Sequence, residues 1–293
     1  MQTTINSSFE LFKRNLKITG LQESTVSIRQ SNVREVIKAG MTITESFLTG
    51  SYSRSTLIAP LNEADIDIFI ILDPKYFHHY DKQNGGQAGL LDLVKRTLRK
   101  TYTKTPDISR NGQAVTIRFD DFMVDVVPAF NRQGGGYLMP NSISQSWIST
   151  DPKKHVEIMA QQNKLHEGKL APLVKMIKGW NKNNGKIFRS FHLEILAMQI
   201  FKGVKISDYP SGIRFFFDKA RSFIITPLLD PAGYGGNIGS YINTQAKTND
   251  SLSKLQSAYE LSLTAEYEES RHNTKNAVEY WRKAFGGYFP AYG

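Results

Sequence analysis

The sequence of 293 residues contains no cysteine. This absence excludes disulfide bonds, thiolate metal sites and cysteine nucleophiles, and it is compatible with a reducing cytoplasm. Long apolar runs are missing too, because no uninterrupted stretch approaches the ~20 residues that a membrane-spanning helix needs. The first segment, "MQTTINSSFELFKRN", is polar and lacks the apolar core of a secretory signal. We therefore expect a soluble, cytoplasmic protein with no membrane partner.

Acidic residues are the scarcer charge, with 27 Asp and Glu against 37 Lys and Arg, which gives a formal net charge of +10. Such an excess favours nucleotides, nucleic acid or acidic protein surfaces as partners, although a basic surface can also serve solubility alone. The segment "LVKRTLRKTYTKT" collects several of these cations. It is most simply a solvated helix face, and the alternative is a contact with nucleic acid or with a partner protein.

The chain has enough apolar material for a sizeable core, since 40% of its residues are hydrophobic and 11% are aromatic. Hydrophobic periodicity in the first half predicts helices at residues 7–18, 24–39 and 87–102, with strands at 47–49 and 65–72. A turn at Gly50-Ser51 leads to an expected short helix near residues 53–58. The stretch "AVTIRFDDFMVDVVPAF" is typical of two strands joined by a tight turn, and "NRQGGGYLMPNS" of a loop or hairpin.

The second half has a helical pattern throughout. Asp151 is a suitable N-cap, with Pro152 at the first helical position. Further helices are expected at residues 170–183, 190–202, 210–226 and 250–285. The sequence therefore predicts an α+β fold, with a mixed sheet and flanking helices in residues 1–165 and a C-terminal helical lobe in residues 166–293.

One apolar strand, "DIDIFIIL", carries two carboxylates. Residues two apart in a strand share a face, so Asp65 and Asp67 point the same way while the isoleucines line the other face. Two like charges on a mostly buried strand repel each other and resist desolvation. If the strand that carries Asp125 is a neighbour, three carboxylates converge, and such oxygen ligands suit Mg²⁺. The alternative for the pair, capping of amides or pairing with Arg or Lys, is less favoured because of this third acid.

The segment "TGSYSRST" precedes the acids and is a candidate phosphate-binding turn. Gly50 permits close backbone approach, and Ser51 offers a hydroxyl and an amide to a triphosphate. A following helix N-terminus adds oriented N–H groups and a favourable dipole for anions.

Together these segments resemble the signature of the polymerase β-like nucleotidyltransferase superfamily, which consists of Gly-Ser, an acidic pair and a third acid. Within it the chain is most similar to the bacterial cGAS/DncV-like nucleotidyltransferases, which also resemble oligoadenylate synthases. Further segments match in the expected order: "GGGYLMPNS…WISTDPKKHVE", "LAPLVKMIKGWNK", "RSFHLEILA", "LLDPAGYGGNIG" and "YWRKAFGGYFP". The resemblance covers most of the chain and implies a two-lobed fold with the active site in the cleft.

The resemblance also implies roles for individual residues. Asp65, Asp67 and Asp125 would hold two Mg²⁺ ions, with Mn²⁺ as an alternative. The donor triphosphate would be bound by residues of the turn and of the helical lobe, namely Gly50, Ser51, Ser53, Lys178 and Ser190. Phe191 would stack on a base. From the residues alone, a solvated lysine at 178 and a core aromatic at 191 remain open.

The implied activity is the joining of nucleoside triphosphates, ATP among them, into a cyclic di- or trinucleotide with release of pyrophosphate. The resemblance places such enzymes in bacterial antiphage (CBASS-type) signalling, where the product activates a separate effector. A linear oligonucleotide or RNA-tailing enzyme is the alternative that the net charge also suits. A catalytically silent RNA-binding regulatory module is expected to lack one acid, and none is missing.

The final segment, "YWRKAFGGYFPAYG", carries one more expectation. Some relatives are regulated by joining their C-terminal residue to a target through a ubiquitin-like conjugation apparatus. An unhindered Gly293 is chemically suited to this. The simpler alternative is an ordinary chain end, with Phe285, Tyr288 and Phe289 docked on the helical lobe.

Overall fold

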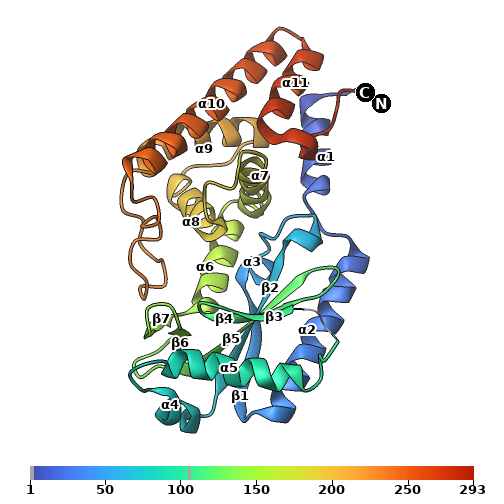
Figure 1. Ribbon diagram of the computed structural model, residues 1–293. Helices are drawn as coiled ribbons and strands as arrows, with labels where there is room; N and C mark the ends of the chain where they lie inside the picture. The colour runs from blue at the N-terminus through green and yellow to red at the C-terminus, as the bar shows by residue number, and fades with distance from the viewer. Residues whose placement is uncertain (1–2, 105–106) are drawn as a thin grey trace. The chain divides into compact units, whose positions relative to one another are not determined.

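A computed structural model describes residues 3–104 and 107–293 (Figure 1). The helices and strands follow in this order: α1 (Ile5–Asn15), α2 (Gly20–Gly40), β1 (Ile43–Thr49), α3 (Gly50–Ser53), β2 (Asp65–Leu72), α4 (Pro74–Tyr80), α5 (Gly86–Arg99), β3 (Asp107–Asn111), β4 (Ala114–Arg118), β5 (Met123–Asn131), β6 (Tyr137–Asn141), β7 (Ser146–Thr150), α6 (Pro152–Leu165), α7 (Leu170–Asn183), α8 (Ser190–Ile200), α9 (Tyr209–Phe223), α10 (Gln245–Ser270) and α11 (Thr274–Phe285). They form two compact units. A sheet unit comprises Ile18–Arg54 and Ala59–Val156, and a helical unit takes the rest, including the short segment Ser55–Ile58. The division into a catalytic core of residues 1–165 and a C-terminal helical lobe of residues 166–293 stays a prediction.

The sheet unit is built on a mixed sheet with the strand order β1-β2-β5-β4-β3, extended by the pairing of β6 with β5 and of β7 with β6. Strands β2 and β5 run parallel and form its centre, while the other pairs are antiparallel. In this central pair Asp65 is level with Met123, and Asp67 is level with Asp125. The predicted α+β fold with a mixed sheet and flanking helices is confirmed.

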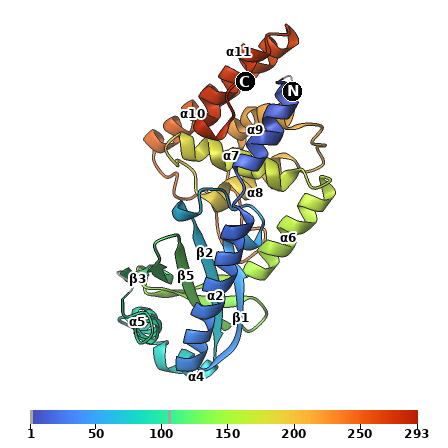
Figure 2. The same cartoon turned by 90° about the vertical axis from the view of Figure 1, so that its right-hand side faces the viewer.

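Helices α2 and α5 pack against each other and against the sheet (Figures 1 and 2). Arg34 of α2 ties the helix to the sheet by donating from Nε to Ser46 Oγ and from Nη2 to Ser46 O, at 2.8 and 2.7 Å. Ser46 alternates with Phe47 on β1, so α2 covers the face opposite to Phe47. Ile66, Ile68 and Ile70 are at most 1% exposed, which the burial of β2 in the middle of the sheet explains.

The helical unit has its own apolar core, to which α1 and helices α7 to α11 contribute. Aromatic side chains dominate one side of it. Phe9 and Phe12 of α1 contact Trp281 and Phe285 of α11, and Phe289 packs on the same group. Each of these rings is at most 1% exposed, and burial of such large apolar surfaces is a main source of stability. The docking of Phe285 and Phe289 is therefore confirmed, while conjugation of Gly293 stays a prediction.

Two helix predictions were wrong. The short helix expected near residues 53–58 ends at Ser53, because Ser55 adopts a left-handed φ of 59° and the Thr56 side chain is fully buried. The helix expected over residues 250–285 is two helices, since His272 has a φ of 61° and Asn273 precedes the first residue of α11. In contrast, Asp151 caps α6 as predicted, with the Lys154 N–H donating to its Oδ1 at 3.0 Å.

Helix α4 follows β2, and Asp73 caps it by accepting the Lys75 N–H at 2.9 Å. The "NRQGGGYLMPNS" segment is a hairpin between β5 and β6, as one of the two alternatives predicted. Within the described parts of the chain, no helix combines the length and apolar character needed to cross a membrane.

Candidate active site

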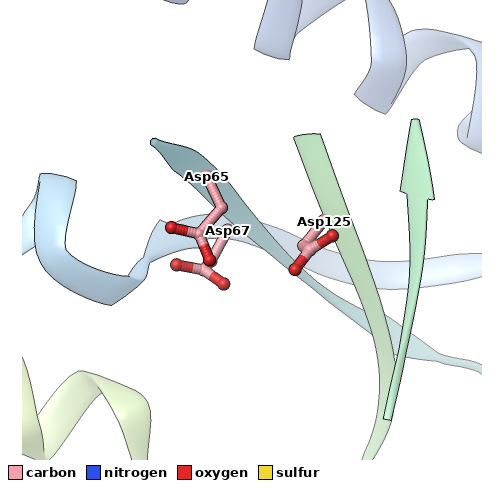
Figure 3. A group of neighbouring side chains, drawn as sticks. All are labelled: Asp65, Asp67 and Asp125. Carbon is pink, nitrogen blue, oxygen red and sulfur yellow. The ribbon is translucent and has the colours of Figure 1, made fainter. Parts of the chain in front are cut away.

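Three carboxylates meet on one face of the sheet, as the spacing of the acids predicted (Figure 3). Asp65 and Asp67 come from β2, and Asp125 comes from the parallel neighbour β5. One carboxylate oxygen from each of the three lies within 4.8 Å of the other two. Asp65 is exposed and the other two are half-buried. The close approach follows directly from the register, because Asp67 and Asp125 are paired across the two strands.

The environment of Asp125 raises the pKa of its carboxyl group. Burial is the largest cause, and the negative charge of Asp65 adds to it. Two neighbours act in the opposite direction. Thr116 of β4 donates from Oγ1 to Asp125 Oδ1 at 2.5 Å, and the positive charge of Arg118 also favours the ionised form. Thr116 was not predicted from the sequence, where its only signal is its position in the alternating strand "AVTIR".

Gly50 brings the chain backbone against the acidic pair. It has a φ of 68°, in the left-handed region that favours glycine. A Cβ atom at this position would lie 1.7 Å from Asp67 Oδ2. Gly50 is the first residue of α3, directly after Thr49, which pairs with Asp67 across β1 and β2. The sequence segment that was predicted to bind phosphate therefore abuts a predicted metal ligand.

The three carboxylates fit a hard divalent cation. Their donor atoms are all oxygens, which are the ligands that Mg²⁺ and Mn²⁺ prefer. The raised pKa of Asp125 reflects the cost of ionising it beside Asp65 in a partly buried site. A cation between the carboxylates would offset that cost. The arrangement is able to hold a metal, as the sequence predicted from the acids.

Lys178 lies in a buried polar network of the helical unit. Its Nζ donates to Glu194 Oε1 at 2.6 Å and to both oxygens of Thr56, at 3.0 Å for the carbonyl and 3.1 Å for Oγ1. The side chains of Lys178 and Glu194 are 5% and 0% exposed. A solvated lysine is therefore wrong for this position, and contact with a triphosphate stays a prediction. Glu194 was missed, although a lone acid in the apolar helix "SFHLEILAMQI" signals a buried partner.

Ser190 and Phe191 begin helix α8. Ser190 is exposed, as the first residue of the helix, and Phe191 is half-buried against the core of the helical unit. Phe191 is therefore only in part a core aromatic. The roles of Ser190 in phosphate binding and of Phe191 in base stacking stay predictions, as does that of Ser53 at the end of α3.

His192 forms a second polar group at this end of α8. Its Nδ1 lies 2.8 Å from the hydroxyl of Tyr241, which also accepts the Arg189 N–H at 3.0 Å. We assign the proton of this hydrogen bond to the Tyr241 hydroxyl, so that Nδ1 of a neutral His192 accepts it. Burial, with a smaller effect of the Arg189 charge, lowers the pKa of His192 from 6.5 to about 4.

Acidification should therefore destabilise the protein through His192. His192 binds a proton near pH 6.5 in the unfolded chain and only near pH 4 in the folded chain. Its contribution to stability, present above pH 6.5, is therefore lost as the pH falls. We expect a loss of about 2 kcal/mol between about pH 7 and pH 5. In His192→Asn the amide oxygen accepts the Tyr241 hydroxyl without titrating. Urea unfolding of both proteins at the two pH values should show a larger fall in the free energy of unfolding for the wild type than for the variant. An equal fall in the two proteins would contradict the role of His192 in the pH dependence of stability.

Comparison with known proteins agrees with this fold. Residues 3–163, more than half of the chain, match the Second Messenger Oligonucleotide or Dinucleotide Synthetase domain (SMODS). A probable cyclic nucleotide synthase of Bacillus cereus is 26% identical over 277 residues, covering 83% of this chain and 81% of its own. A cyclic AMP-AMP-AMP synthase of an Acinetobacter species is 28% identical over 262 residues, covering 84% of this chain and 72% of its own.

Solved structures show the same fold. Escherichia coli CdnC with ATP aligns with a TM-score of 0.76 at 20% identity, covering 98% of this chain and 99% of that one. A structure of the same protein in complex with HORMA-deltaN gives a TM-score of 0.75 at 19% identity, with 98% of each chain covered. The Vibrio cholerae dinucleotide cyclase DncV gives a TM-score of 0.69 at 16% identity, covering 84% of this chain and 70% of that one.

A mixed sheet with an acidic triad beside a Gly-Ser turn defines a nucleotidyltransferase of the polymerase β-like superfamily. The chain belongs to the SMODS family, the bacterial cGAS/DncV-like nucleotidyltransferases. It is accordingly an enzyme of second-messenger synthesis that uses nucleoside triphosphates.

Proposed function

We propose that this enzyme joins nucleoside triphosphates, with ATP as one substrate, into a cyclic di- or trinucleotide. The observation that carries the proposal is the convergence of Asp65, Asp67 and Asp125 next to Gly50. In each step a ribose hydroxyl attacks the α-phosphorus of a donor and forms a new P–O bond. The bond from that phosphorus to the β-phosphate oxygen breaks, and pyrophosphate leaves. A last transfer within the linear product closes the ring.

Within the site, Asp65, Asp67 and Asp125 would hold two Mg²⁺ ions, or Mn²⁺ in their place. Bound divalent cations lower the pKa of the attacking hydroxyl and stabilise charge on the leaving pyrophosphate. The chain's own residues orient the reactants. Ser51 offers its hydroxyl and amide to the donor triphosphate, and Thr116 fixes the Asp125 carboxylate by its hydrogen bond.

Three residues of the helical unit are further candidates for nucleotide binding. We propose that Ser190 contacts the triphosphate at the N-terminus of α8, where the helix dipole favours an anion. The accessible part of Phe191 would stack on the donor base. Lys178 would act on the triphosphate by its positive charge while its ion pair with Glu194 fixes its position.

The relatives support ATP as a substrate and a signalling role. Two curated relatives are cyclic AMP-AMP-AMP synthases, and one solved relative holds ATP. We propose that the product acts as a second messenger in bacterial antiphage defence, of the CBASS type, and activates a separate effector.

The chemistry of the product tests this proposal. A ring has no terminal phosphomonoester, so phosphatase cannot shorten it. The enzyme should convert labelled ATP, alone or with a second nucleoside triphosphate and Mg²⁺, into a phosphatase-resistant product. Mass spectrometry should then give the mass of a cyclic di- or trinucleotide. If all products collapse to nucleosides or shortened species after phosphatase, a linear tailing enzyme is the better interpretation.

A further inference from the structure

Two cavities adjoin each other within the helical unit. The first has a volume of about 500 Å³ and lies between α6, the C-terminal half of α8 and residues 223–231. The second has a volume of about 540 Å³ and lies between the end of α6 and residues 202–206. Gln162 and Lys202 line both cavities, so these two side chains mark the place where the cavities meet. Each volume is in the usual range of small-molecule sites.

Apolar side chains form much of the wall of both cavities. In the first, Ile195 and Met198 are 5% and 8% exposed, and Phe223 is half-buried against the core. At the rims, Leu229 of the first cavity and Leu165 of the second are 66% and 74% exposed. Single exposed leucines are ordinary, but these two border concave surfaces. Such walls fit the faces of planar aromatic groups.

Four uncommitted polar side chains surround the junction of the cavities. They are the amides of Gln162 and Gln199 and the ammonium groups of Lys202 and Lys205. Within residues 3–104 and 107–293, none of the four side chains has a hydrogen bond or an ion pair. They are therefore available to a ligand, and the two lysines favour an anionic one.

The acids that line the cavities do not neutralise these lysines. Glu167 of the second cavity pairs with Lys169, at 3.6 Å between Oε2 and Nζ. Asp230 of the first cavity accepts the N–H groups of Ala232 and Gly235, at 3.0 and 2.9 Å. Both carboxylates thus already serve the protein's own structure, and the charge at the junction stays positive.

This arrangement fits two bases with a phosphate between them. A glutamine amide can hydrogen-bond the N6 and N7 edge of adenine, apolar walls accept the ring faces, and an ammonium group binds a phosphate oxygen. In a phosphodiester-linked pair of nucleotides the phosphate stands between the two bases, as Lys202 stands between the two cavities. ATP carries one base with its phosphates at one end, so it would fill one cavity only.

We propose that these two cavities are a binding site for the cyclic adenine oligonucleotide that the enzyme makes. One base occupies each cavity, and the phosphate that links them contacts Lys202 and Lys205. The inference rests on the proposed function, because its ligand is the product of that function. None of the residues that line the cavities is among those proposed to bind the metal or the donor, and all lie within Glu157–Gly293.

Lys275 of α11 provides a matched control. It is an exposed lysine of the same helical unit, and it lines neither cavity. Lys275→Glu therefore makes the same change of charge as Lys202→Glu without altering the proposed site. Gln199→Ala tests the site without any change of charge.

The experiment measures binding without turnover. Equilibrium dialysis with radiolabelled cyclic AMP-AMP-AMP, cyclic di-AMP or ATP, in the absence of divalent cations, gives the Kd for the wild type and the three variants. We expect Lys202→Glu to weaken binding of at least one of the cyclic ligands by about tenfold to a hundredfold, the usual range for a hydrogen bond to a charged group. Gln199→Ala should weaken it by about threefold to tenfold.

Lys275→Glu should bind the same ligand within about twofold of the wild type, and all three variants should keep the wild-type KM for ATP in turnover. Cyclic ligands that bind all four proteins equally, or none of them, would overturn the inference. So would an ATP affinity as high as that for the cyclic ligands and equally weakened by Lys202→Glu, since the site would then not select the product. A wild-type enzyme that makes no phosphatase-resistant product would instead refute the proposed function itself.

Discussion

Replacing Asp65 and Asp67 together with asparagine is expected to abolish nucleotide transfer, with a loss of at least about a thousandfold. Asparagine keeps the size and the oxygen acceptor of each side chain, so the fold is retained. Two charges that hold the cations are removed, however, and the metal site loses most of its affinity. In the absence of metal the variant should be at least as stable as the wild type, because the repulsion among neighbouring carboxylates is relieved.

Asp120→Asn is the control for this experiment. Asp120 is an exposed acid in the turn between β4 and β5, so its replacement should leave activity within about twofold of the wild type, as surface changes usually do. Activity is followed as pyrophosphate release, and the melting temperature is recorded with and without Mn²⁺. Metal should raise the melting temperature of the wild type and of Asp120→Asn but not that of the double variant. Wild-type turnover by the double variant would refute the role of the acids.

Gly50→Ala should be nearly as damaging, although it adds only a methyl group. Its Cβ would overlap Asp67 Oδ2 at 1.7 Å, a distance that forces the carboxylate or the turn to move. The left-handed φ of 68° adds backbone strain. Because precise placement of ligands dominates phosphoryl transfer, we expect at least about a hundredfold loss of kcat. Melting temperature and turnover are measured on the same preparations.

Gly112→Ala separates backbone strain from the clash. Gly112 has a φ of 61°, close to that of Gly50, but its Cβ would meet only the Ile143 side chain at an ordinary 3.4 Å. It should lower stability by about 1–2 kcal/mol and leave turnover nearly intact. If the two alanine variants lose activity equally, the contact between Gly50 and Asp67 does not matter for the reaction.

The sequence was sufficient to predict the acidic site because its signals are local. The period of two in a strand puts Asp65 and Asp67 on one face, and the apolar strand around Asp125 is unmistakably buried. Their meeting required only that β2 and β5 be neighbours, which two strongly apolar strands favour. Gly50 was likewise predicted as a site of close backbone approach, although its contact with Asp67 could not be predicted from the segment alone.

Other features depend on contacts between distant segments. The buried network of Thr56, Lys178 and Glu194 joins residues up to 138 apart, and no local pattern reports such a pairing. Strands β3 and β7 are short and partly exposed, so they lack a clear alternation.

Anomalous diffraction from crystals grown with Mn²⁺ and a non-hydrolysable ATP analogue is the direct test of metal binding at the acidic triad. We expect two Mn²⁺ peaks about 3.5–4 Å apart, both coordinated by Asp65, Asp67 and Asp125, with the triphosphate on Gly50 and Ser51. Manganese bound elsewhere, or a triphosphate that does not reach these carboxylates, would contradict it.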